Sequence, residues 1–342
     1  MKKMKPYHLL GLIALVLIAA CSKPAEQKAY KAKTVTRENL FGIGAYGTSN
    51  AWIAGYEGLI IHTSDGGANW EYQKAPSSTD LYKPFFIDST TGWIVGRQGT
   101  VLHTIDGGKT WAQQNTGSQE RLFDICFIDH ETGWAVGTMG TILHTTDGGK
   151  TWVAQGFGED RYYNSVFFID AQRGWVVGEY GKIYHTEDGG QKWVEQICQD
   201  IIPKEDDFDF PPPPPSLYSV YFVSPLRGWA AGMDGTVIRT DDGGATWNKV
   251  VTVAKFALYS LSVHGMQGWA IGDRGEYIRS TDGGTTWIRV DASIKTRNWL
   301  RDMVFTDENH GWVVGMSGTI LRSEDGGSTW KTVSGTVIDD IK

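Results

Sequence analysis

The chain repeats one phrase seven times at a nearly constant interval. The phrase reads HTSDGGANW at 62–70, HTIDGGKTW at 103–111, HTTDGGKTW at 144–152, HTEDGGQKW at 185–193, RTDDGGATW at 239–247, RSTDGGTTW at 279–287 and RSEDGGSTW at 322–330. Its aspartates are separated by 41, 41, 41, 54, 40 and 43 residues. A regular period of about 20–50 residues is typical of solenoids and propellers, in which each repeat is one supersecondary unit packed on its neighbours. This repeat limits the fold more strongly than any other feature.

A second phrase occurs in step with the first and divides each repeat into four short segments, A to D. In the third repeat they are LFDICFID at 122–129, GWAVG at 133–137, TILHT at 141–145 and the run from Trp152 onwards. Short β-rich runs between glycine turns indicate strands, and four strands in about 40–45 residues are typical of a propeller blade. We predict an all-β fold over residues 38–342, a seven-bladed β-propeller of four-stranded antiparallel blades. An extended solenoid, the alternative, would need capping ends that we do not find.

The repeated phrase falls at the turn between segments C and D. Its aspartate can accept hydrogen bonds from turn amides, and its glycines tolerate positive φ. Seven copies of one turn cannot all be one active site, so we assign a structural role to Asp65, Asp106, Asp147, Asp188, Asp242, Asp282 and Asp325. Fourteen of the 15 tryptophans occupy repeat positions, where their rings can fill the gaps between sheets, and Trp299 alone lies outside them.

The first residues have the pattern of an export signal. MKKMK is followed by the apolar run LLGLIALVLIAA, which is shorter than a membrane span, and then by Cys21. This arrangement resembles a bacterial lipobox, which implies a lipoprotein signal peptide at 1–20, lipidation of Cys21 and a lipidated tether at 21–37. We therefore expect an exported protein that is lipid-anchored and faces the periplasm, and Ser22 favours the outer membrane. An ordinary signal peptide with a chance cysteine is the alternative.

Charge and composition exclude several classes of protein. Residues 1–20 carry three lysines and no acid, so their removal takes the formal charge from −7 to −10, which argues against a nucleic-acid partner. His62, His103, His144 and His185 share one repeat position and are interpreted as structural. We expect no metal and no cofactor. The pairing of Cys126 with Cys198 stays open, because their separation in space does not follow from the sequence.

The pattern Ser/Thr-x-Asp-x-Gly-x-x-Trp resembles the Asp box, or bacterial neuraminidase repeat, which occurs in propellers of several functions. Together with phrases such as GWAVGTMG and TILHT, it resembles the photosystem II stability and assembly factor family. That resemblance implies a non-enzymatic, membrane-anchored binding scaffold whose partner is a membrane protein or its precursor. In photosynthetic members the client is a reaction-centre subunit of photosystem II. We expect a monomeric propeller.

Two alternatives remain. A sialidase-like glycosidase would need an arginine cluster and a Tyr–Glu pair, and the Arg-Ile-Pro or Arg-Leu-Pro signature of that family is missing. A glycan-binding Asp-box propeller is the other alternative. We expect an aromatic-lined channel if the ligand is a glycan and an arginine-lined one if it is an acidic peptide.

The repeat also predicts where a partner binds. In a propeller the B–C turns and D–A loops share one face, and the A–B and C–D turns share the other. The B–C turns diverge in sequence between blades, so we place recognition on their face. Arginines and aromatic residues gather there at Arg97, Arg121, Arg161, Tyr180, Arg274, Trp299 and Arg301, the candidate partner-binding residues; Arg297 lies beside them. Surface arginines paired with acids such as Glu120 and Asp160 are the alternative.

An insertion at 199–216 accounts for the interval of 54 residues. It reads QDIIPKEDDFDFPPPPPS, and its five prolines favour a stiff polyproline II rod. As a D–A loop it should project from the face of the variable turns. A docking peptide, a lid and a tolerated surface insertion are its three interpretations.

Overall fold

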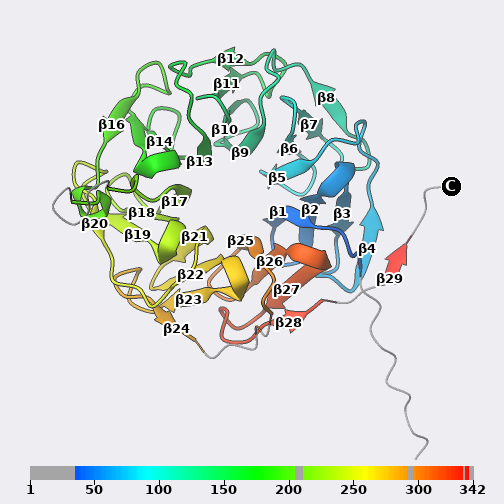
Figure 1. Cartoon of the computed structure of the whole chain (residues 1–342). Helices are drawn as coiled ribbons and strands as arrows, with labels where there is room; N and C mark the ends of the chain where they lie inside the picture. The colour runs from blue at the N-terminus through cyan, green and yellow to red at the C-terminus, as the bar shows by residue number, and fades with distance from the viewer. Residues whose placement is uncertain (1–34, 205–210, 291–293, 295, 334–335, 339–342) are drawn as a thin grey trace, which may run out of the picture. The chain divides into compact units, whose positions relative to one another are not determined.

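The computed structural model describes residues 35–204, 211–290, 294, 296–333 and 336–338. The chain divides into units 1–32 and 33–342, and only the second contains described residues. Its strands form seven antiparallel sheets around a central channel (Figure 1), which confirms the predicted seven-bladed propeller. In the described part of the chain, no helix has the length and apolar character needed to cross a membrane. The expected lipidation site, Cys21, lies outside the described residues.

Each blade is built from four consecutive strands, with A innermost and D outermost. Blade 1 comprises β1 (Leu40–Tyr46), β2 (Asn50–Gly55), β3 (Ile60–Thr63) and β4 (Asn69–Tyr72). Blade 2 comprises β5 (Leu81–Phe86), β6 (Gly92–Gly96), β7 (Val101–Thr104) and β8 (Ala112–Gln114). Blade 3 comprises β9 (Leu122–Phe127), β10 (Thr132–Gly137), β11 (Ile142–Thr146) and β12 (Val153–Ala154). Blade 4 comprises β13 (Tyr163–Phe168), β14 (Gly174–Gly178), β15 (Ile183–Thr186) and β16 (Val194–Gln196).

The remaining blades follow the same order. Blade 5 comprises β17 (Leu217–Phe222), β18 (Gly228–Gly232), β19 (Val237–Thr240) and β20 (Asn248–Lys249). Blade 6 comprises β21 (Leu258–His264), β22 (Gln267–Gly272), β23 (Tyr277–Ser280) and β24 (Ile288–Arg289). Blade 7 comprises β25 (Leu300–Phe305), β26 (Gly311–Gly315), β27 (Thr319–Ser323) and β28 (Lys331–Thr332). The 3₁₀ turns are η1 (Tyr56–Gly58), η2 (Glu179–Gly181), η3 (Gln199–Ile201), η5 (Met233–Gly235), η6 (Asp273–Gly275) and η7 (Met316–Gly318).

The two ends of the propeller meet, so the repeats form a closed ring and not a solenoid. On the inner side, Ile43 of blade 1 donates its amide to the Asp302 carboxylate of blade 7 at 2.9 Å. On the outer side, β29 (Thr336–Ile338) pairs in parallel with β4 and makes blade 1 five-stranded. Val35 and Thr36, within the segment expected to be a tether, are also buried, and Val35 packs in the core cluster that contains Trp70 and Trp312.

The hydrophobic core lies between neighbouring blades, where aromatic rings stack across the interface. Trp93 of blade 2 has the Phe127 ring of blade 3 on one side, at 3.6 Å between centroids, and its own strand neighbour His103 on the other, at 4.9 Å. Its indole N–H donates to the Gly148 carbonyl in the Asp-box turn of blade 3, at 3.1 Å. Each strand-B tryptophan of blades 1 to 6 donates in this way to the next blade.

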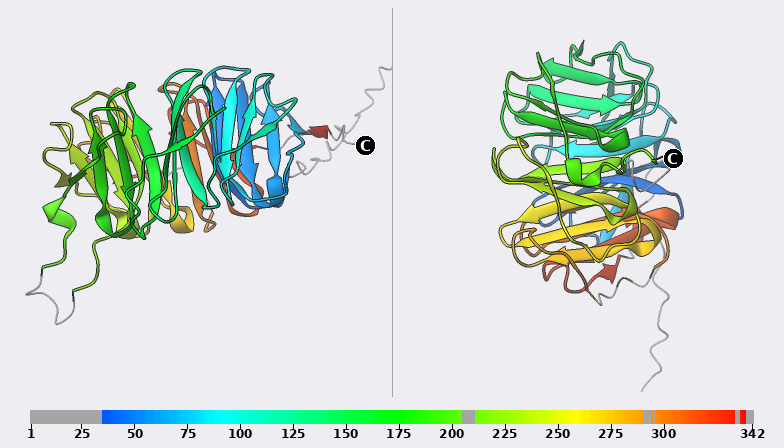
Figure 2. Two further views of the ribbon diagram at one scale, coloured as in Figure 1. Left: turned by 90° about the horizontal axis from the view of Figure 1, so that it is seen from above. Right: turned by 60° about the vertical axis from the view of Figure 1, so that its left-hand side comes forward.

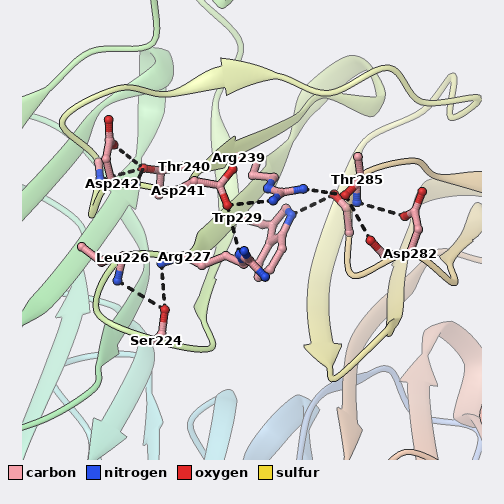
Figure 3. A network of polar contacts seen from close by, with 12 residues as sticks. Ser224, Leu226, Arg227, Trp229, Arg239, Thr240, Asp241, Asp242, Asp282 and Thr285 are labelled. Carbon is pink, nitrogen blue, oxygen red and sulfur yellow. Dashed lines mark hydrogen bonds and ion pairs between the residues drawn. The ribbon is translucent and has the colours of Figure 1, made fainter.

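Two kinds of side-chain bridge reinforce these interfaces. Blades 1 to 4 have a histidine on strand C and a glutamine in or directly after strand D. The glutamines are Gln73, Gln114, Gln155 and Gln196. Gln114, for example, donates to the Gly148 carbonyl at 2.8 Å and accepts from the Trp152 indole at 3.2 Å. Blades 5 to 7 replace the pair with arginine and valine at Arg239 and Val250, Arg279 and Val290, and Arg322 and Val333. Figure 3 shows the arginine type, in which Arg239 lies over the Trp229 ring and donates to Thr285 of the next blade at 2.6 Å.

The Asp-box turns are held internally by their own side chains. Asp147 accepts hydrogen bonds from the Thr151 amide at 2.9 Å and from the Thr145 and Thr151 hydroxyls at 2.9 and 2.7 Å. Hydrogen bonds to the charged carboxylate, from the Thr151 amide above all, lower the pKa of Asp147 to about 2. The other six aspartates accept from their own turns in the same pattern. Their hydrogen-bonding capacity is used in fastening strand C to strand D.

The insertion after blade 4 is attached at both ends. At its start, Asp200 accepts from the Lys249 amide of β20 at 3.0 Å, and the Cys198 thiol donates to the Trp247 carbonyl at 3.3 Å. At its end, the Ser216 carbonyl accepts from the Met233 amide at 2.9 Å. The prolines at 211–213 are exposed between these two attachments. Cys126 and Cys198 are free, buried thiols in different core clusters, so they form no disulfide.

Candidate binding face

The B–C turns and D–A loops meet on one side of the ring, which we call the tip face. There the Gly140 amide of a B–C turn donates to the Arg161 carbonyl of the following D–A loop at 2.7 Å. The A–B and C–D turns meet on the other side, the box face, where the Gly148 amide donates to Glu131 at 2.8 Å. Figure 2 shows the blades edge-on between these two faces, with the described ends of the insertion, 199–204 and 211–216, extending beyond the tip face. The predicted sorting of turns into two faces is thus observed.

Every innermost strand contains a β-bulge at the same position near the tip face. In β5, for example, Leu81 pairs with Gly96 and Lys83 with Val95, so the intervening Tyr82 has no partner on β6. The seven bulged residues, which we call the mouth ring, are Phe41, Tyr82, Phe123, Asn164, Tyr218, Tyr259 and Arg301. A bulge leaves one residue unpaired, bends the strand locally and re-aims a side chain. Here it presents one side chain per blade to the mouth of the channel.

The mouth ring is mainly aromatic. Phe41 and Tyr82 lie 5.6 Å apart between centroids, Tyr82 and Phe123 5.8 Å, and Tyr218 and Tyr259 5.4 Å. Arg301 lies over the Tyr259 ring at 4.9 Å, a cation–π arrangement. All seven residues line a small cavity of about 80 Å³ at this end of the channel. A cavity of that size holds a single side chain, and the aromatic rim around it offers a stacking surface.

A polar layer, which we call the floor, lies below the mouth. It contains the residue that follows each mouth residue, namely Gly42, Lys83, Asp124, Ser165, Ser219, Ser260 and Asp302. Several of these side chains accept an amide from the innermost strand of the next blade: Asp124 from Val166, Ser165 from Val220, Ser219 from Leu261 and Asp302 from Ile43. The floor thereby satisfies amides at the inner edges of the blades, which have no strand partner there.

At the interface of blades 1 and 2, both the acceptor and the donor of this hydrogen bond are missing. Gly42 has no side chain that can accept a hydrogen bond, and its counterpart across the interface is Pro84, which has no amide to donate. The two backbones come so close that a Cβ on Gly42 would stand 2.1 Å from the Tyr82 carbonyl oxygen. Glycine and proline at these positions therefore depend on each other.

Lys83 is the cation of the floor. Its ammonium donates to Asp302 at 2.7 Å across the ring. Burial by itself would lower the pKa of Lys83, but the charges of Asp302 and Asp124 outweigh it and raise the pKa above its ordinary value. Burial raises the pKa of Asp124, against the opposing effects of Lys83 and of the Ser165 hydroxyl. Lys83 and Asp124 also line the larger cavity on the box side, of about 290 Å³, so the floor borders both cavities.

The candidate arginines and aromatic residues all lie on the tip face, but only Arg301 belongs to the mouth ring. Trp299 stacks on Phe41 at 6.3 Å and extends the aromatic rim outwards. Burial raises the pKa of Tyr82, the charge of Asp80 adds to that shift, and the charges of Arg121, Arg97 and Arg301 oppose it. Arg97 and Arg121 are exposed.

Two further candidates form cation–π pairs away from the channel. Arg161 lies over the exposed ring of Tyr180 at 4.7 Å, and Arg274 lies over Phe256 at 4.6 Å. Glu120, an acid considered as an arginine partner, accepts the Thr138 hydroxyl at 2.6 Å. The face therefore combines arginines with aromatic rings.

The B–C turns hold non-glycine residues in left-handed backbone conformations. The φ angles lie between 51° and 59° at Glu57, Gln98, Met139, Tyr180, Asp234, Arg274 and Ser317. Most L-residues resist this region, and glycine would adopt it freely. Each of the seven turns keeps a side chain at this strained and exposed position, and the side chains differ, a pattern that favours a role in binding.

Sequence reasoning missed most of the mouth ring and the whole floor. The signal was present as the residue that follows the first leucine of segment A, which is aromatic in five repeats. The direction of that side chain depends on the bulge, however, and a bulge is a property of strand pairing that the sequence does not show.

The comparisons with known proteins agree with this geometry. The family model described as photosynthesis system II assembly factor YCF48 matches residues 23–119, 113–206, 212–296 and 291–342. The chain belongs to this family. No curated protein sequence matches the chain.

Solved structures of family members share the fold. A structure described as YCF48 bound to D1 peptide is 20% identical, with 85% of this chain and 95% of that chain covered and a TM-score of 0.68. YCF48 from Cyanidioschyzon merolae is 19% identical, with 84% and 96% covered and a TM-score of 0.67. A GH74 xyloglucanase from Xanthomonas campestris is 14% identical, with 89% and 56% covered and a TM-score of 0.67. At these identities the likeness concerns the fold alone.

Proposed function

We propose that this YCF48-family propeller is a non-enzymatic scaffold whose mouth binds an extended segment of a membrane protein or its precursor. The carrying observation is the mouth ring, whose seven side chains surround a cavity of about 80 Å³ with the floor beneath it. A segment can lie across the aromatic rim and insert one side chain into this cavity. Holding a segment at the rim suits an assembly factor, which must later release its client.

The charges around the mouth favour a segment with carboxylates. Against the effect of burial, the charges of Arg97, Arg121 and Arg301 all act on the Tyr82 hydroxyl and lower its pKa, and guanidinium groups bind carboxylates with paired hydrogen bonds. The similar YCF48 structure holds a D1 peptide, which supports a peptide ligand for this chain as well. The floor carboxylates have structural partners: Asp124 accepts a backbone amide, and Asp302 accepts a backbone amide and the Lys83 ammonium. Their presence in the channel is therefore explained without a glycosidase.

The test is a titration of the full chain with a fluorescently labelled D1 peptide and with the same peptide in which carboxylates are replaced by amides. Arg301→Gln should weaken binding by about tenfold or more, because it removes a charged donor beside the inserted side chain. Arg173→Gln on the box face, where Arg173 pairs with Asp170, is the matched control and should bind normally. Equal affinity of the two peptides, or no effect of Arg301→Gln, would refute the proposal.

A glycan is the second candidate ligand, because the mouth ring is more aromatic than basic. Aromatic rings stack on sugar faces, and GH74 propellers share the fold. Titration with neutral oligosaccharides separates the two candidates: saturable glycan binding that Tyr82→Ala abolishes and Arg301→Gln leaves intact would favour the glycan over the peptide.

We also propose that the chain is exported and lipid-anchored through Cys21, as its lipobox-like sequence implies. Metabolic labelling with a fatty-acid probe should mark the full chain and fail to mark Cys21→Ala. Label that persists in Cys21→Ala would disprove anchoring at this residue. Separation of inner and outer membranes would test the outer-membrane location.

A further inference from the structure

The aromatic rim of the mouth ring is interrupted on blade 4, where the bulged residue is Asn164. Its neighbours in the ring are Phe123 of blade 3 and Tyr218 of blade 5, and an asparagine reaches less far than either ring. Tyr162, which is 41% exposed, lies 6.1 Å from the Phe123 ring between centroids and continues the aromatic surface outwards. A segment that lies across the mouth can therefore cross the rim at Asn164 and still contact aromatic rings on its way out.

One hydrogen bond fixes the orientation of the Asn164 side chain. Its Nδ2 donates to the Leu217 carbonyl of blade 5 at 2.8 Å. Because a carbonyl oxygen only accepts, this contact also identifies which end of the amide is the nitrogen. Within the described part of the chain the side chain has no second hydrogen-bond partner, and it lines the cavity of about 80 Å³. Its carbonyl oxygen and its other N–H are left for a ligand.

The chemistry of this amide differs from that of the other six mouth residues. Phe41 and Phe123 have no polar group, each tyrosine offers a single hydroxyl, and Arg301 can only donate. Asn164 alone presents a donor and an acceptor on neighbouring atoms of one rigid group. An extended peptide has the complementary pair, because each residue other than proline carries one N–H and one C=O. The amide is thus suited to a main chain more than to any particular side chain.

Asn164 and Arg301 lie on opposite sides of the mouth, since blade 4 is three blades from blade 7 in one direction and four in the other. The charges on the two sides differ. Glu179, in the B–C turn of blade 4, accepts the Tyr162 amide at 3.0 Å just outside the interruption. Burial raises the pKa of Tyr218, the charge of Glu179 adds to that shift, and the charge of Arg301 opposes it. A carboxylate of the segment is therefore favoured near Arg301, and an uncharged peptide group is favoured near Asn164.

We infer that Asn164 binds the main chain of the client segment where the segment crosses the rim: its carbonyl oxygen accepts a peptide N–H, and its second N–H donates to a peptide C=O. Arg301 binds a carboxylate of the same segment on the far side, and the inserted side chain lies between these two contacts. This inference rests on the peptide function proposed above and adds to it a residue that recognises the main chain.

The test extends the peptide titration proposed above with a series of labelled peptides in which one backbone N–H at a time is replaced by N-methyl. The full chain is compared with Asn164→Leu and with the matched control Phe123→Leu, which removes a neighbouring rim side chain that forms no hydrogen bond. Thermal unfolding checks each variant, because Asn164→Leu also loses the contact with Leu217. Asn164→Ser, which is smaller and has no amide, repeats the measurement if the leucine variant does not fold.

In the unaltered chain, N-methylation at one peptide position should weaken binding by about tenfold, because the Asn164 carbonyl loses its donor. Asn164→Leu should weaken binding of the parent peptide by about as much, and N-methylation at that position should then have little further effect. Phe123→Leu should keep the full N-methyl effect.

An N-methyl effect of the same size in Asn164→Leu would overturn the inference, and so would unchanged binding of the parent peptide by this variant. If Arg301→Gln still weakened binding in either case, the proposed function would stand without the main-chain contact. A parent peptide that did not bind the full chain at all would refute the proposed function and this inference together.

Discussion

The floor makes a quantitative prediction about how the ring is closed. Asp302 of blade 7 accepts the Ile43 amide of blade 1 at 2.9 Å, the Lys83 ammonium of blade 2 at 2.7 Å and the Ser260 hydroxyl of blade 6 at 3.3 Å. One carboxylate thus connects four blades. The side chains of Lys83 and Asp302 are 26% and 10% exposed, so their ion pair is largely withdrawn from water.

Replacing Asp302 by serine should remove the charge and keep the amide bond. Ser165 and Ser219 show that a serine at this position accepts the amide of the next blade. The loss therefore falls on Lys83, which keeps a partly buried charge near Asp124 alone. Breaking a buried pair costs about 3–5 kcal/mol, and the partial exposure of Lys83 reduces this to about 2–3 kcal/mol. For a domain of this size that corresponds to a fall in Tm of roughly 3–5 °C.

The decisive variant is Asp302→Ser combined with Lys83→Ser, which gives six of seven blades a serine or smaller residue in the floor. It should recover much of the lost stability, because the unpaired ammonium is gone and Asp124 keeps its hydrogen bonds from the Ser165 hydroxyl and the Val166 amide. Thermal unfolding followed by circular dichroism measures both variants, and the difference between the double variant and the sum of the single ones gives the coupling energy. A double variant no more stable than Asp302→Ser would refute the ion-pair reasoning.

Three further predictions follow from the packing. Gly42→Ala should lower the free energy of unfolding in urea by at least about 2 kcal/mol, because its Cβ would meet the Tyr82 carbonyl. Gly117→Ala, where φ is 68° and no atom lies within 4 Å of the new Cβ, should lower it by only about 1 kcal/mol. Phe127→Ala should cost about 3–5 kcal/mol by the same measurement, and the exposed Ile105→Ala should have almost no effect. Burial lowers the pKa of the four strand-C histidines, although Glu71 partly opposes the shift at His62. The unfolded chain therefore binds more protons in acid than the folded chain does. Tm should fall as the pH drops below about 6.5, and it should fall less in His144→Gln.

The sequence was sufficient to predict the number of blades, the four strands of each blade and the sorting of the turns onto two faces. The period of the Asp boxes fixes the number of blades, and the alternation of glycine turns with apolar runs fixes the four strands of each. The sequence also placed Arg301 and Trp299 near the channel, since both begin segment A of blade 7. These inferences succeed because they depend on local pattern and on repetition.

What could not be predicted depends on contacts between distant residues. Lys83 and Asp302 are separated by 219 positions, and nothing near either residue indicates the other. The pairing of β29 with β4 joins the end of the chain to its first blade. The attachment of Asp200 to β20 likewise depends on a neighbouring blade. The bulges are subtler, because strict alternation along segment A would send Tyr82 and its counterparts to the wrong side.

The bulges also bear on how such a protein can change over time. Each mouth side chain stands on an unpaired residue, between a buried leucine or tyrosine on one side and a floor residue on the other. Replacing the mouth residue leaves the strand pairing and the floor as they are, and alters only contacts at the rim, such as the hydrogen bond from Asn164 to the Leu217 carbonyl of blade 5. The ring therefore has seven positions at which selection can alter recognition with little effect on folding, and relatives with the same blades can have different clients.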